Sequence, residues 1–135
     1  MRSLATLAVL VLAAPAWAAG ADCSAPATQL DLNHCAAQTQ AGLDAELDGA
    51  YAEALARLGE DEPARKLLAD AQNAWRAYRD ADCAFVAQPA EGGSIQPMIV
   101  ANCRADVTRA RLATVRSWLA CPEGDLACPL PPKAP

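Results

Sequence analysis

The chain has 135 residues, with 11 basic, 16 acidic and six cysteine residues, and this length suffices for one small domain. The formal net charge is −5 and no basic patch is present, which excludes nucleic acid and anionic membranes as natural partners. The acidic excess either favours a basic partner by electrostatic steering or only keeps the protein soluble.

The first 18 residues have the features of a secretory signal peptide. Arg2 is basic, residues 4–14 are apolar, and Ala16-Trp17-Ala18 fits a small-x-small cleavage site. The apolar run is shorter than the about 20 residues that span a bilayer, so we expect no membrane anchor after cleavage. The mature protein is therefore expected to be periplasmic or secreted.

Apolar residues recur every three or four positions along most of the mature chain, which predicts long helices and no strands. The first helix is expected to begin after Thr28, a suitable N-cap, and to end near Leu58. Gly59 suits a helix end and Asp61 a new N-cap, so a second helix is expected over about residues 62–86. Because the connection is short, these two helices are expected to be antiparallel.

The second half of the chain contains one more predicted helix. Residues 88–94 are expected to form a loop, since a proline and paired glycines cannot continue the helix. A third helix is expected over residues 97–119. Residues 121–135 hold five prolines and two cysteines, which is typical of an irregular tail. The predicted fold is all-α: a small, disulfide-stapled bundle over residues 19–120, made of an antiparallel helical hairpin and a third helix.

The second helix is expected to supply the bulky part of the core. Its apolar stripe consists of Leu68, Ala71, Trp75, Tyr78 and Phe85. If the hairpin turn centres on residues 60 and 61, Arg79 faces Asp44, which predicts an ion pair across the helices; the alternative is a solvated arginine. The residues predicted to be structural are Asp44, Leu47, Tyr51, Trp75, Tyr78 and Arg79.

The cysteines of an exported chain are expected to be oxidised, because their number is even. They are Cys23, Cys35, Cys83, Cys103, Cys121 and Cys128. Sequential pairing is favoured: Cys23 with Cys35, Cys83 with Cys103, and Cys121 with Cys128. The alternative joins Cys35 to Cys83 and Cys23 to Cys103, which the hairpin register also permits.

Several ordered groups of residues resemble one known family. The first group is Cys23-x11-Cys35 with Thr28-Gln29, Asn33, Asp44, Leu47 and Tyr51. The second is Ala71-Gln72-x-Ala74-Trp75-x-x-Tyr78-Arg79-Asp80-Ala81-x-Cys83-x-Phe85, and the third is Gly92-Gly93-Ser94 with Pro97-Met98, Cys103 and Thr108-x-x-Arg111. Together they cover about residues 23–120 and resemble the lysozyme-inhibitor LprI-like N-terminal domain. The resemblance implies an all-helical, secreted or periplasmic domain, and the family name implies inhibition of lysozyme.

No group of residues suggests catalysis, a metal site or a cofactor. His34 is the only histidine and adjoins Cys35, whose expected oxidation removes the thiolate that a Cys–His pair needs. No two cysteines have the close spacing of a zinc site. The chain is therefore expected not to be an enzyme.

The loop Gly92-Gly93-Ser94 is the candidate partner-binding element. A loop held at its base by a disulfide binds at a lower entropic cost; the alternative is an ordinary connection. The expected function is that of a binding protein, an inhibitor of lysozyme-type hydrolases or a ligand of another basic envelope protein. The alternative is a structural or adaptor protein of the cell envelope.

Overall fold

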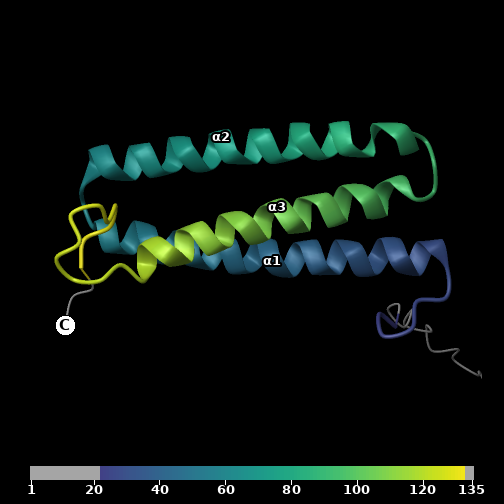
Figure 1. The fold of residues 1–135 in the computed structure, drawn as a ribbon, viewed down its shortest axis with the longest axis horizontal. Helices are drawn as coiled ribbons and strands as arrows, with labels where there is room; N and C mark the ends of the chain where they lie inside the picture. The colour runs from purple at the N-terminus through teal and green to yellow at the C-terminus, as the bar shows by residue number, and fades with distance from the viewer. Residues whose placement is uncertain (1–21, 133–135) are drawn as a thin grey trace, which may run out of the picture.

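A computed structural model describes residues 22–132, and the predicted signal peptide lies outside this range. The described residues form three long helices: α1 (Gln29–Leu58), α2 (Glu62–Ala87) and α3 (Gln96–Leu119). A short 3-10 helix, η1 (Gln88–Ala90), follows α2. No strand occurs between residues 22 and 132, so the predicted all-α fold is confirmed (Figure 1).

The ends of the helices follow from local side-chain chemistry. The Thr28 hydroxyl accepts a hydrogen bond from the Asp31 backbone N–H, and the Asp31 carboxylate accepts one from the Thr28 N–H, which makes a capping box. Gly59 ends α1 with a φ of +57°, which favours glycine. The Asp61 side chain then caps α2 by accepting from the Ala64 N–H at 3.1 Å.

The helices run alternately up, down and up, with α3 as the main packing partner of both others. In Figure 1, α1 and α2 are antiparallel, and α3 lies along α1 and returns beneath α2. The contacts of α1 with α3 are by far the most extensive, whereas α1 and α2 touch each other little. Small side chains such as Ala101 and Ala105 are buried on α3, which lets its backbone come close to its neighbours. The hairpin of α1 and α2 is therefore held largely through the third helix.

The core is aliphatic and lies towards the end of the bundle where α3 stops. Its buried residues are Leu47, Ala54, Leu58, Leu68, Leu112, Val115 and Leu130. Leu47 is thus buried as predicted, while Tyr51 and Trp75 are partly buried against this cluster. Leu130 comes from the irregular tail, which folds back onto the bundle. Arg57 fastens that tail, since its guanidinium donates to the carbonyl oxygens of Leu119 and Pro131.

The predicted apolar face of the second helix is wrong in part. Tyr78 is 60% exposed, Phe85 is 79% exposed, and Ala71 is also exposed. The helix instead buries Leu68, Gln72, Cys83 and Ala87. Consecutive residues of an α-helix differ by about 100° in direction, so a shift of one position moves the buried face by about a quarter turn.

The structure contains the sequential set of disulfides. Cys23 bonds to Cys35, Cys83 to Cys103 and Cys121 to Cys128, and the alternative pairing does not occur. The Cα–Cα distances are 5.5, 5.6 and 5.9 Å, within the usual range for disulfides. The first bond holds the N-terminal lead to α1, the second joins α2 to α3, and the third closes a turn in the tail.

Candidate functional site

The loop between η1 and α3 is exposed but well ordered by hydrogen bonds. The Gly93 N–H donates to the Ala90 carbonyl at 2.9 Å, and the Gly92 N–H donates to the Gln96 side chain at 2.9 Å. The Asn33 side-chain amide donates to the Ser94 carbonyl at 2.9 Å, which ties the loop to the start of α1. Gly92 has a φ of +74°, a conformation that side chains with a Cβ rarely adopt. The three predicted partner-binding residues thus form a preordered, solvent-facing turn.

A groove lined by both polar and apolar side chains borders this loop. It has a volume of about 350 Å³ and lies between the end of α2 and the start of α3, where Asp80, Glu91, Gln96 and Arg104 contribute to its wall. Arg104 lies 3.2 Å from the Asp80 carboxylate. Glu91 has no ion pair among residues 22–132, so its charge remains available next to Gly92.

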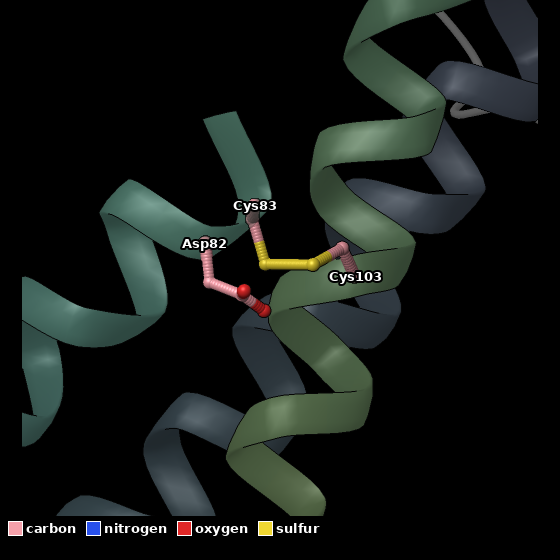
Figure 2. A group of neighbouring side chains, drawn as sticks. All are labelled: Asp82, Cys83 and Cys103. Carbon is pink, nitrogen blue, oxygen red and sulfur yellow. A yellow bond between two sulfur atoms is a disulfide. The ribbon is translucent and has the colours of Figure 1, made fainter. Parts of the chain in front are cut away.

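The disulfide between α2 and α3 forms the base beneath the loop. Figure 2 shows the carboxylate of Asp82 beside the Cys83–Cys103 bond. The three side chains have ligand atoms within 4.8 Å of one another, the only such group of metal-binding side chains between residues 22 and 132. The two sulfur atoms are bonded to each other and Cys83 is fully buried, so this group acts as a crosslink in the oxidised protein.

A buried polar network joins all three helices near their middle. Arg79 donates to Asp44 Oδ1 at 2.8 Å and to Thr108 Oγ1 at 3.1 Å, and the Thr108 hydroxyl donates to the same Asp44 oxygen at 3.1 Å. The predicted ion pair is therefore confirmed. Arg79 also lies over the Trp75 ring, 5.0 Å from its centre. Only 12% of the Arg79 side chain is exposed, so the network lies inside the bundle, where it holds the three helices together.

A second buried network was not predicted from the sequence. Gln72 is almost fully buried and accepts a hydrogen bond from Arg111 at 3.1 Å, and Arg111 lies over the Trp118 ring at 5.0 Å. Burial lowers the pKa of Arg111 from its usual value. Gln72 occupies a buried position of α2 beside the stripe that the sequence suggested. Glutamine is usually exposed on protein surfaces, so the sequence alone did not indicate that Gln72 is buried.

The only histidine is exposed on α1. His34 shares a hydrogen bond with the Gln38 side chain at 2.9 Å, and the neighbouring Cys35 is in a disulfide. The geometry therefore gives His34 no thiolate to activate.

The surface carries an excess of negative charge. Arg76 pairs with Asp48 at 2.9 Å and Arg116 pairs with Glu46 at 2.7 Å, and most other basic side chains of the described part are likewise paired. No helix of the described part combines the length and apolar character needed to cross a membrane.

The helices and the three disulfides together define a small all-helical domain, with a hydrogen-bonded loop between α2 and α3 at one end. Residues 21–114 match the family described as Lysozyme inhibitor LprI, and the chain belongs to this family. A relative from Rhizobium meliloti (strain 1021), named only as an uncharacterized protein, is 37% identical over 109 residues. That match covers 73% of this chain and 78% of the relative. No solved structure matches the chain.

Proposed function

We propose that the protein is exported and inhibits a lysozyme-type cell-wall hydrolase by binding to it. Membership of the Lysozyme inhibitor LprI family is the observation that carries this proposal. The features of a signal peptide over residues 1–18 support export. Three disulfides are typical of proteins that fold in an oxidising compartment, and they support the same location.

The ordered loop supports inhibition by contact with a cleft or surface of the hydrolase. Its backbone is already fixed by hydrogen bonds from Gly92, Gly93 and Asn33, so little conformational entropy is lost on binding. Glu91 adds a negative charge that is not neutralised within residues 22–132. A hydrolase with a basic surface fits this charge best.

The proposal is tested by the clearing of a bacterial cell-wall suspension by several types of lysozyme. Purified, oxidised protein lacking residues 1–18 is titrated into each reaction. Inhibition that saturates at about one protein per enzyme is expected for at least one lysozyme type. Undiminished clearing by every type at a large micromolar excess would contradict the proposal.

The contribution of the loop is tested by reversing one charge. Glu91→Lys is expected to weaken inhibition at least tenfold, about 1.4 kcal/mol, because it places a positive charge at the contact. Glu123→Lys is the matched control, since Glu123 is an exposed acid of the tail. Figure 1 shows the tail, in yellow, at the opposite end of the molecule from the connection between α2 and α3. Equal inhibition by both variants would mean that another surface makes the contact.

A further inference from the structure

Helix α2 carries a continuous apolar stripe on the side that faces away from the other helices. We call it the outer stripe; it consists of Leu67, Ala71, Ala74, Tyr78, Ala81 and Phe85. All six residues are exposed, and the exposed fractions of Leu67, Tyr78 and Phe85 are 72, 60 and 79%. No other element of the described chain lies along the outer side of α2 in Figure 1. A contiguous apolar surface of this kind marks an interaction site.

The spacing of the outer stripe identifies the shape of its partner. Successive members are four, three, four, three and four residues apart, which is the repeat of a helix that packs along another helix. This pattern of spacings is symmetric about residue 76. A second α2 in antiparallel orientation therefore places Leu67 opposite Phe85, and Ala74 opposite Tyr78. Such self-complementarity is what a two-fold interface between identical chains requires.

An apolar cavity lies beside the N-terminal end of the outer stripe. Its volume is about 250 Å³, and it is lined by Leu58, Ala64, Leu67, Leu68, Ala71, Trp118, Pro129 and Leu130. Leu67 and Ala71 also belong to the outer stripe, so the cavity opens beside its first turn. Phe85 lies 18 residues further on, about 27 Å along the helix axis. In the antiparallel arrangement, Phe85 of a second copy reaches the level of Leu67 and can place its ring in this cavity.

The residues that flank the outer stripe are compatible with close approach. Ala77 and Ala84 are exposed on one flank and are small, so two helices can come near each other there. With residue 76 as the centre, Asp70 of one copy lies at the level of Asp82 of the other, but the two residues lie on opposite flanks of the outer stripe, so their carboxylates are on opposite sides of the interface. No carboxylate on these flanks faces another carboxylate, although the chain as a whole is acidic.

We propose that the protein forms a two-fold dimer in which the α2 helices pack antiparallel through the outer stripe. Phe85 of each copy occupies the apolar cavity of the other. One leucine and two aromatic side chains per copy bury on the order of 500 Å² together with the alanines. The total of about 1,000 Å² is at the lower limit for a specific interface, so the dimer is expected to dissociate in the micromolar range.

Sedimentation velocity on the oxidised, signal-free protein, from about 5 to about 200 µM, tests the proposal. The wild type is expected to change from monomer to dimer in this range. Phe85→Glu is expected to weaken dimerisation at least tenfold, and Leu126→Glu makes the same change at a fully exposed tail position as control. Leu67→Glu is a second stripe variant, and circular dichroism checks that each variant is folded. A wild type that stays monomeric, or a Phe85→Glu variant that dimerises normally, would overturn the proposal.

Crosslinking of single cysteine variants tests the orientation. In the antiparallel register centred on residue 76, the two copies of residue 77 are about 3 Å apart along the helix axis, whereas the two copies of residue 84 are about 24 Å apart. Ala77→Cys is therefore expected to crosslink with a short thiol-specific reagent, and Ala84→Cys is not. Equal crosslinking of the two variants, or none at residue 77, would overturn the antiparallel register. These measurements involve no hydrolase, so they succeed or fail independently of inhibition.

Discussion

Arg79 shows how one charged residue connects three helices. It lies on α2, pairs with Asp44 on α1, and shares Thr108 on α3 with that carboxylate. A charge that is nearly excluded from water is costly without its partner. The ion pair was predictable because the turn at residues 60 and 61 fixes which positions face each other. The role of Thr108 was not, because it depends on how α3 docks.

Replacing Asp44 with alanine is expected to destabilise the fold by about 2–4 kcal/mol, because it removes the carboxylate closest to Arg79 and leaves only the half-exposed Asp80, at 3.2 Å, to pair with this nearly buried charge. The lower part of the range allows for the 32% exposure of the Asp44 side chain. Asp48→Ala is the control, since its pair with Arg76 is largely exposed and is expected to contribute at most about 1 kcal/mol. Urea denaturation of both variants measures the difference. Equal losses would contradict a special role for the buried pair.

The capping box of α1 predicts a dependence on pH. Hydrogen bonds from the Thr28 hydroxyl and N–H hold the pKa of Asp31 below its usual value. A carboxylate with a lowered pKa in the folded state stabilises that state above its unfolded pKa of about 4 and loses this effect as the pH falls through the folded value. Asp31→Asn is therefore expected to have a lower melting temperature than wild type at pH 7. The gap should narrow as the pH falls below the unfolded value and close below the lowered pKa of the folded state. A gap of constant size across this range would show that ionisation of Asp31 is unimportant.

At the scale of elements, the disulfide between α2 and α3 compensates for limited packing. The helices are long but their buried side chains are mostly small, and Cys83–Cys103 joins α2 to α3 beneath the loop. The boundaries of the helices were predictable because Thr28, Gly59 and Asp61 act locally. The face by which α2 packs was not predictable, because Tyr78 and Phe85 are as apolar as core residues and only the position of α3 shows that they are outside.

Replacing both Cys83 and Cys103 with alanine is expected to destabilise the fold by about 3 kcal/mol, because the bond closes a segment of 20 residues. Replacing both Cys121 and Cys128 should cost less, about 2 kcal/mol, because that segment has 7 residues. Thermal and urea unfolding of the two double variants measure the order. The reverse order would show that the tail staple, not the interhelical one, dominates stability.

At the scale of the whole molecule, the net charge of −5 acts differently on the two proposed associations. Salt screens repulsion between two acidic copies, so the dimer is expected to become tighter at higher ionic strength. Salt also screens attraction to a basic hydrolase, so that complex is expected to form more slowly and bind more weakly. Sedimentation and binding kinetics at about 0.05 and about 0.5 M salt measure both. If salt strengthened both associations, or weakened both, the net charge would not control their strength.

The sequence by itself determined the helical class, the helix ends and the likeness to the LprI family, because these depend on short-range spacing and on residues near one another in the chain. It also placed Arg79 opposite Asp44, since a short turn leaves little freedom in register. Only the tertiary structure decided which cysteines pair, that Gln72 is buried, and that the aromatic residues of α2 face outwards. Those outcomes depend on where α3 lies, and packing between distant segments sets that position.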